Sequence, residues 1–411
     1  MSSSPASPAR RAGWGVAIAA TLGMSVSYID RQTLAAIAPA VRSALTINHT
    51  QFGWLVAAFS MAYLVGAPAA GIMVDKLGAR RGFAVAVVFW SLVAGAHAFA
   101  SSFATLFALR VLLGTAESPS FPAAAQAIRR CLPGARRPTA YGMLFTGSSI
   151  GAMIAAPLAI LLEARYGFRF AFVGTAAAGT LWIPFWLFMT RGDRLRAEAA
   201  PVRAVEAPPS ASWLDVVRSP VVLRALVAVI GAAPTVMFVQ TWTSQYLVER
   251  WTLPRSGISG YLLVPPLLFD VGAVGFGWLA SMRETQGSDE APKTHRDLIL
   301  VAASLAAMLA LAPFAPSPGV AMAFFGAAAC GGGGVYVIVT ADMLSRVPVG
   351  RTSSAGGMTA AAQSLALIAA NPLIGLTIDR THGYGVATVT LGLAVLPTSL
   401  AFALWPTARK R

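Results

Sequence analysis

The 411-residue sequence is 56% hydrophobic and only 11% charged, whereas about a quarter of the residues in an average soluble protein are charged. Its formal net charge is +15, but the basic residues lie in short clusters between apolar runs and form no single basic patch. This composition excludes a soluble globular domain and gives no support to nucleic-acid binding, and it indicates a protein that crosses a membrane many times. The two cysteines, Cys131 and Cys330, are far apart and predict no disulfide framework.

Twelve apolar runs are long enough to cross a bilayer, because about 20 helical residues span its hydrocarbon core. We therefore predict an all-α polytopic membrane protein with twelve transmembrane helices. The predicted spans are 13–38, 52–74, 82–100, 103–127, 139–162, 169–190, 220–247, 257–281, 297–315, 319–343, 354–377 and 385–406.

Most of the 31 lysine and arginine residues lie in the two terminal tails and in the loops that follow even-numbered spans. Cytoplasmic loops carry such an excess of basic residues. The distribution predicts a multi-pass protein of the inner (plasma) membrane with both termini in the cytoplasm.

The longest break between spans, residues 191–219, is rich in Ala, Pro and Arg and divides the spans six and six. The halves also resemble each other, because five residues of the first half recur 215 positions later: Pro133, Arg136, Gly142, Met143 and Pro157 match Pro348, Arg351, Gly357, Met358 and Pro372. Parallel repeats of this kind place a substrate site near the bilayer midplane between the halves. The predicted organisation is a cytoplasmic tail (1–12), a six-helix bundle (13–190), a cytoplasmic linker (191–219), a second six-helix bundle (220–406) and a basic tail (407–411).

Four charged residues lie inside predicted spans of the first half: Asp30 and Arg31 in span one, and Arg110 and Glu117 in span four. A charge at the bilayer centre costs about 2.5–3.5 kcal/mol or more, so we expect all four to face a protein-lined cavity and partly neutralise one another. Arginine stays protonated and offers two parallel donors to a carboxylate, whereas an acid can exchange its proton as its surroundings change. The arginines are therefore candidate anion receptors and the acids candidate proton carriers. The alternative is a structural ion-pair cluster that joins spans one and four.

Residues Gly71 to Arg81 match the loop signature of the major facilitator superfamily, G-x-x-x-D-x-x-G-x-R-R. The resemblance covers the whole chain, with its twelve spans and six-plus-six repeat. It implies a cytoplasmic conformational latch made by Gly71, Asp75, Gly78, Arg80 and Arg81. In the second half, Ser281 stands where the acid would be, which predicts a weaker counterpart.

More narrowly, four motifs resemble the anion:cation symporter family, which contains hexuronate and galactonate permeases. They are Y-I-D-R at Tyr28 to Arg31, the run from Arg110 to Pro122, Trp242 with Gln245-Tyr246-Leu247, and Asn371-Pro372. The resemblance implies proton-coupled uptake of a small carboxylate. Carried over, Asp30 and Glu117 are proton-coupling residues, Arg110 is a partner of the acids, and Arg31 with Tyr28 and Asn371 binds substrate.

Three further polar residues, Gln245, Tyr336 and Gln363, are candidates to line the same cavity and bind substrate. For each of them, and for Asn371, a hydrogen bond between helices is the alternative. Asp270 has no counterpart in the family pattern, and it is either a further proton-coupling acid or the partner of a polar neighbour.

The histidines show no paired spacing, so we expect neither a metal site nor a cofactor. The expected partners are a small organic anion, protons and the lipid bilayer, and we expect a monomer that binds no nucleic acid.

Other functions remain open. A drug exporter of the same superfamily would carry G-x-x-x-G-P in span five, where this chain has Gly147 and Gly151 followed by Ala152. A lysolipid or sphingolipid carrier would need a more apolar cavity. An enzyme would need a nucleophile with its base, or a metal cluster, and a sensor would be expected to append a signalling domain; the sequence shows none of these.

Overall fold

The computed structural model of the chain describes residues 8–132, 137–191, 218–285, 295–347 and 352–405. Every regular element within those residues is a helix, which confirms the all-α prediction. The chain divides into two compact units. Unit 1 comprises Met1–Ile47, Ala58–Val202 and Arg255–Ser259, and unit 2 comprises Asn48–Ala57, Arg203–Pro254 and Gly260–Arg411.

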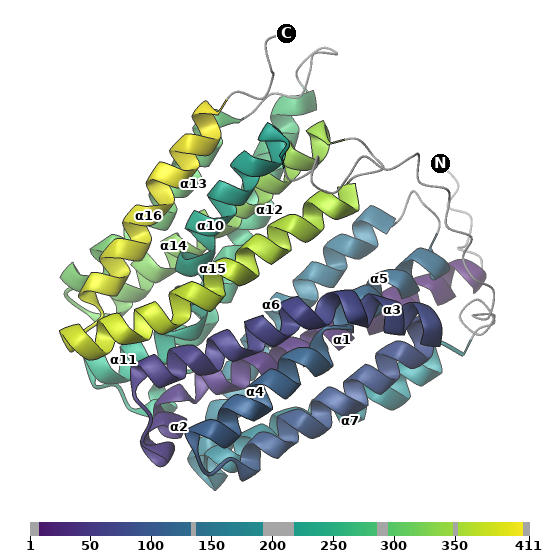
Figure 1. Ribbon diagram of the computed structural model, residues 1–411, viewed down its shortest axis with the longest axis horizontal. Coiled ribbons are helices and arrows are strands. Elements are labelled where there is room, and N and C mark those ends of the chain that lie inside the picture. The colour runs from purple at the N-terminus through teal and green to yellow at the C-terminus, as the bar shows by residue number, and fades with distance from the viewer. Residues whose placement is uncertain (1–7, 133–136, 192–217, 286–294, 348–351, 406–411) are drawn as a thin grey trace. The chain divides into compact units, whose positions relative to one another are not determined.

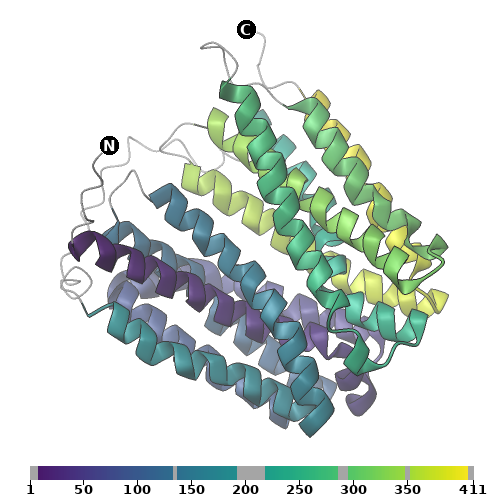
Figure 2. The same ribbon diagram turned by 180° about the vertical axis from the view of Figure 1, so that it is seen from behind.

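Unit 1 is built mainly from the helices of the first half, which Figures 1 and 2 show in purple to teal from opposite sides. These are α1 (Pro8–Ala36), α2 (Ala38–Leu45), the larger part of α3 (His49–Ala96), the short 3-10 helix η1 (His97–Phe99), α4 (Phe103–Glu117), α5 (Ser120–Cys131), α6 (Arg137–Tyr166) and α7 (Phe168–Met189). The 3-10 helix η3 (Arg255–Gly257) also belongs to this unit.

Helix α1 is central to unit 1, because α5, α6 and α7 all pack against it. A cluster of large aromatic side chains fills the core beside it, with Phe83, Trp182 and Trp186 in edge-to-face or stacked contact. The indole of Trp182 donates a hydrogen bond to the carbonyl of Ala19 on α1 (2.8 Å). Because a buried indole N–H needs an acceptor, this bond fixes α7 on α1 and so helps to position the charged residues further along α1.

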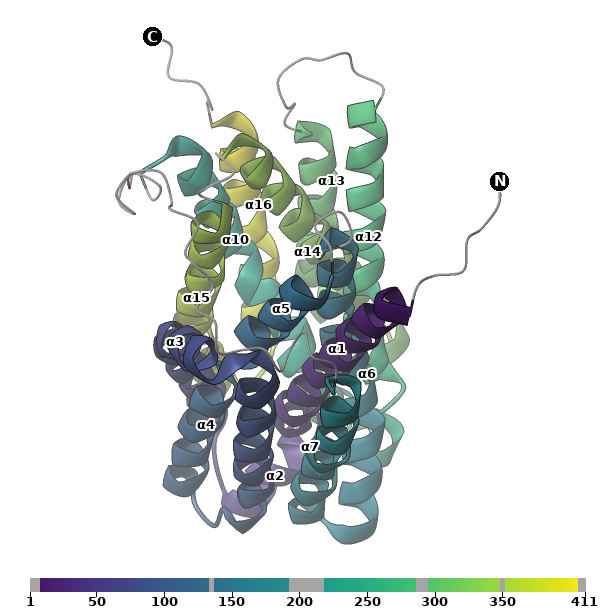
Figure 3. The ribbon, with the colours of Figure 1, turned by 90° about the vertical axis from the view of Figure 1, so that its right-hand side faces the viewer.

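Unit 2 contains the remaining helices, which run from teal through green to yellow in Figure 1. They are α10 (Pro220–Thr241), α11 (Thr243–Trp251), η4 (Tyr261–Leu263), α12 (Val264–Thr285), α13 (Arg296–Ala307), η5 (Met308–Phe314), α14 (Pro318–Arg346), α15 (Thr352–Thr381) and α16 (Gly385–Leu404). Figure 3 shows α12 and α13 next to each other, and α14 packs against both. The first residues of α3, up to Ala57, also cluster with this unit.

Nine helical segments among the described residues are long and apolar enough to cross a membrane: Leu77–Phe99, Thr146–Tyr166, Phe168–Met189, Pro220–Thr241, Tyr261–Ala280, Arg296–Phe314, Pro318–Met343, Met358–Thr381 and Gly385–Leu404. The other three predicted spans, 13–38, 52–74 and 103–127, coincide with α1, the first part of α3, and α4 with α5. Helices therefore lie wherever the apolar runs predicted them.

The run of four glycines, 331–334, lies inside the continuous helix α14. A Cβ atom added at Gly331 would collide with the backbone of α13 at Ala302, and one at Gly333 would collide with the backbone of α12 at Phe269. The glycines thus allow close crossings with two neighbouring helices, which is how small residues act in membrane helix packing.

Helix α12 offers a matched test of this packing. A Cβ atom on Gly272 would overlap the carbonyl group of Cys330 on α14, whereas one on Gly275 meets nothing within 4 Å. We expect Gly272→Ala to lower the free energy of unfolding by about 1–3 kcal/mol through overpacking. Gly275→Ala should leave it unchanged or raise it by up to about 1 kcal/mol, because alanine is the better helix former. Thermal unfolding of both purified variants in one detergent checks this, and equal melting temperatures would contradict the close crossing.

Candidate functional site

Helices α1 and α4 bring together the central ion pair of unit 1. Arg31 on α1 donates from Nη2 to Oε2 of Glu117, the last residue of α4, at 2.8 Å. The hydroxyl of Ser27, one turn earlier on α1, donates to the same carboxylate oxygen at 2.7 Å. Glu117 is completely buried, whereas the Arg31 side chain is 22% exposed. The pair is therefore anchored at its acid end and accessible at its guanidinium end.

Three aromatic rings surround the Arg31 guanidinium. Its central carbon lies 4.6 Å from the ring centroid of Tyr28, 4.4 Å from that of Phe59 and 5.4 Å from that of Tyr63. Contacts of this length are attractive cation–π interactions, which are stronger where water is excluded. The rings hold the cation while leaving N–H donors unused. Among the described residues only Nη2 of Arg31 donates a hydrogen bond, and Nε has no partner.

The other two charged residues lie close to this pair. Arg110 on α4 is buried, and its guanidinium carbon lies 5.0 Å from the ring centroid of Phe59. Phe59 therefore contacts both arginines. Asp30 is 3% exposed, and neither of its carboxylate oxygens has a hydrogen-bond partner among the described residues. An isolated buried carboxylate is costly, and Asp30 stays a predicted proton-coupling residue.

A model of the Major Facilitator Superfamily matches residues 20–370, which is most of the chain and includes this site. The chain belongs to the Major Facilitator Superfamily. It is a multi-pass membrane transporter and not an enzyme, as the sequence predicted.

Relatives of this superfamily member carry names of sugar-acid carriers. The hexuronate transporter of Escherichia coli strain K12 is 36% identical over 181 residues, which cover 44% of this chain and 42% of that protein. The hexuronate transporter of Bacillus subtilis strain 168 is 25% identical over 386 residues, covering 92% and 90%. The galacturonate transporter of Dickeya chrysanthemi is 26% identical over 272 residues, covering 63% and 79%. These relatives agree with the predicted resemblance to anion:cation symporters.

Solved structures of the superfamily share the fold. A bacterial homologue of the human lysosomal transporter Spinster, in an inward-facing and unoccupied conformation, gives a TM-score of 0.73 at 16% identity, covering 96% of this chain and 94% of that one. The nucleoside transporter NupG gives 0.72 at 13% identity, covering 97% and 100%. At these identities the likeness shows the fold alone.

The superfamily's loop signature lies within α3. The helix is interrupted at Gly78, whose φ of 77° and ψ of 156° are non-helical and suit glycine. After this turn, Arg80 donates from Nε to the hydroxyl of Thr190 (3.1 Å), and its carbonyl accepts from the indole of Trp186 (2.9 Å). Arg81 is exposed. The side chains of Gly71 and Asp75 lie outside the described residues, so the latch remains a prediction.

In unit 2, the predicted substrate residue Asn371 is fully buried. Its Oδ1 accepts a hydrogen bond from the indole of Trp242 (3.3 Å), and its Nδ2 donates to the carbonyl of Leu367 (2.9 Å). Asn371 therefore links α15 to the residue between α10 and α11. In this structure it makes the hydrogen bond between helices that was the alternative to a substrate contact.

The other predicted residues of unit 2 are dispersed over different helices. Gln245 on α11 is fully buried, whereas Tyr336 on α14 and Gln363 on α15 are half-buried. Tyr336 packs edge-on against Phe269 with ring centroids 6.1 Å apart. Asp270, the next residue of α12, is half-buried. The substrate role of all four remains a prediction.

The sequence reading missed three members of the unit 1 site. Ser27 lies one helical turn before Arg31, a spacing that would have placed both on one face. Phe59 and Tyr63 are one turn apart on α3. Nothing in the sequence marks them as site residues, because aromatic residues are common in apolar spans. No group of three or more metal-ligating side chains occurs in the described part of the chain.

Proposed function

We propose that this transporter is a proton-coupled symporter that takes up a small organic anion of the sugar-acid type by alternating access. The observation that carries the proposal is the Arg31 guanidinium. It is anchored by Glu117, surrounded by three rings and partly exposed, and it has N–H donors without a partner among the residues that the structure describes. A carboxylate accepts two parallel N–H bonds from such a group. The sugar-acid relatives support the same class of substrate.

Charge balance links the anion to a proton. The four charged residues of the site, Asp30, Arg31, Arg110 and Glu117, have a formal sum of zero when all are ionised. A proton on Asp30 leaves one positive charge in excess, which one substrate carboxylate then neutralises. Moving proton and anion together avoids carrying a net charge through a low-dielectric cavity, where charges are costly. In this proposal Asp30 is the proton carrier and Arg31 the anion receptor.

The orientation is part of the proposal. The excess of lysine and arginine in the predicted cytoplasmic segments supports an orientation with both termini in the cytoplasm. With this orientation the proton gradient of the plasma membrane drives uptake. The exporter and lipid-carrier alternatives are supported by no further observation, since the likeness to a Spinster homologue is one of fold.

Proteoliposomes loaded with a pH-sensitive dye test both parts of the proposal. Galacturonate, glucuronate or galactonate added outside should acidify the lumen, because a proton enters with each anion. Galactose and glucose, which lack the carboxylate, should give no response above that of protein-free liposomes. Entry of sugar acids without proton movement would contradict coupling, and no response to any sugar acid would contradict the substrate class.

A further inference from the structure

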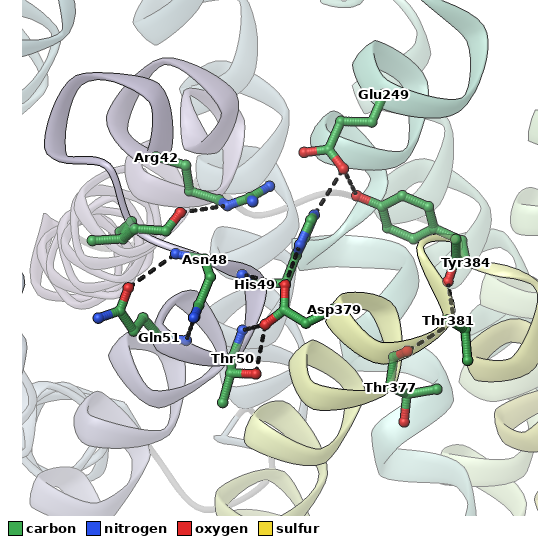
Figure 4. A network of polar contacts seen from close by, with 12 residues as sticks. Arg42, Asn48, His49, Thr50, Gln51, Glu249, Thr377, Asp379, Thr381 and Tyr384 are labelled. Carbon is green, nitrogen blue, oxygen red and sulfur yellow. Dashed lines mark hydrogen bonds and ion pairs between the residues drawn. The ribbon is translucent and has the colours of Figure 1, made fainter.

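A second polar cluster lies in unit 2, at the end where α15 stops and α16 begins (Figure 4). His49, the first residue of α3, has Nδ1 2.7 Å from Oδ1 of Asp379 on α15 and Nε2 2.7 Å from Oε2 of Glu249 on α11. The hydroxyl of Tyr384 donates to the same Glu249 oxygen at 2.8 Å. These four residues are called the His49 cluster below. It lies outside the candidate transport site, and the proposed function assigns it no role.

Asp379 caps the start of α3 from a different helix. Its Oδ1 accepts the backbone N–H of His49 (3.1 Å), and its Oδ2 accepts both the backbone N–H of Thr50 (2.8 Å) and the Thr50 hydroxyl (2.6 Å). The first N–H groups of a helix have no partner within the helix, and their positive end attracts a carboxylate. Asp379 therefore acts as an acceptor for the start of α3, with the His49 ring as a further contact.

The ring of His49 makes this attachment depend on a proton. A neutral imidazole has one N–H donor and one acceptor nitrogen, whereas an ionised carboxylate only accepts. Both ring nitrogens lie 2.7 Å from a carboxyl oxygen. The arrangement is satisfied when the ring carries two protons, or when Glu249 is protonated and donates to Nε2. Without that proton, a nitrogen lone pair faces a carboxylate at hydrogen-bond distance, which is repulsive.

Two aromatic rings pack against the His49 imidazole. Tyr384 presents its edge to the ring at 6.1 Å, and Trp242 stacks on it at 6.4 Å. The His49 side chain is only 15% exposed. Arg42 on α2, also drawn in Figure 4, belongs to unit 1, where it donates to the carbonyl of Ile47 (3.3 Å).

We infer that the His49 cluster is a proton-dependent clamp that fastens the start of α3 to α11 and α15, on the side of the membrane predicted to be extracellular. Histidine is the side chain whose ordinary pKa lies closest to neutral pH. The fastened state binds one more proton than the released state. Its population relative to the released state therefore falls by up to about tenfold for each pH unit of alkalinisation.

The clamp matters because of the path of α3. Residues 48–57 cluster with unit 2, and the helix then continues into unit 1 from Ala58. Any step that moves the start of α3 away from α15 must first break the His49 cluster. External acid would oppose that step and external alkali would favour it. The inference is independent of the substrate, so it can fail without affecting the proposed function.

Hydrogen exchange of the full-length protein in nanodiscs tests the clamp. The readout is the protection factor of peptides covering residues 48–57, corrected for intrinsic exchange, at pH 5.5, 6.5, 7.5 and 8.5. Protection in the wild type should fall at least about tenfold between the lowest and highest pH. Glu249→Gln should keep protection high at every pH, because an amide NH2 in the place of Oε2 has two hydrogens, one to donate to the neutral ring and one to donate to the Tyr384 hydroxyl. His49→Gln should show low protection at every pH.

His382→Asn is the matched control, since this exposed histidine follows α15 at a positive φ that asparagine tolerates. It should reproduce the wild-type pH profile. A flat wild-type profile would overturn the inference, as would a pH dependence that survives in Glu249→Gln. Glu249→Gln is nearly isosteric, so the test stands even if His49→Gln does not fold.

Discussion

Arg31→Ala should reduce the affinity for a sugar acid by at least about 30-fold and abolish its uptake. Truncating one member of a buried charge pair costs about 2–5 kcal/mol, and each 1.4 kcal/mol is a factor of about ten in affinity. The variant removes the group proposed to bind the anion and leaves Glu117 without its cation. Isothermal titration of the purified protein with galacturonate measures the affinity directly.

Two further variants separate binding from folding. Arg31→Lys keeps the charge but loses the planar pair of donors, so its affinity should fall between those of the wild type and the alanine variant. Arg169→Ala removes an exposed arginine of α7 that contacts Phe168 and should bind like the wild type. Unchanged affinity in a folded Arg31→Ala protein would remove Arg31 from the substrate site.

Asp30→Asn should abolish accumulation driven by a proton gradient while retaining exchange of labelled for unlabelled substrate. Asparagine has the size of the protonated acid and no charge, so the site should remain permanently in its anion-binding form. In the proposed cycle this uncouples transport from protons without removing the anion receptor. Uptake with and without an inward proton gradient, together with counterflow at equal pH, measures the two activities.

Asp297→Asn is the corresponding control, because Asp297 is 61% exposed and pairs with Arg283 at the start of α13. It should retain both activities. Wild-type accumulation in Asp30→Asn would assign proton coupling to another acid, of which Glu117 is the first candidate. Loss of both accumulation and exchange would indicate that Asp30 supports substrate binding itself.

The helices and the charged site were predictable from sequence because the membrane imposes strong constraints. A helix is the form in which an apolar segment satisfies its own backbone in lipid, so runs of about 20 apolar residues locate the helices. The same medium makes Asp30, Arg31, Arg110 and Glu117 conspicuous, because isolated charges in apolar runs are rare.

The pairing within the site was not predictable. Sequence placed the four charges in one half but left open which would meet. The structure pairs Arg31 with Glu117 and Ser27, and leaves Asp30 without a hydrogen-bond partner among the described residues. These contacts depend on the rotation of α1 and α4 about their axes, which packing against neighbouring helices decides.

The contacts of the His49 cluster were the least predictable from the sequence. The predicted spans 13–38 and 52–74 leave His49 outside any helix, whereas the structure makes it the first residue of α3. Its partners Glu249 and Asp379 are 200 and 330 residues away in the chain. Each of the three is ordinary near the end of a span, where charged side chains reach water, so none is conspicuous alone.

The sequence by itself therefore determined the membrane class, the helices, the superfamily and the charged residues within apolar spans. Each of these depends on local composition and on the free-energy cost of placing polar groups in lipid. Only the tertiary structure decided how Arg31 is held and what the start of α3 contacts. Those features depend on which helix faces pack together, and packing joins residues with no relation in sequence. It anchors the Arg31 guanidinium to Glu117, and it places the imidazole of His49 between two carboxylates.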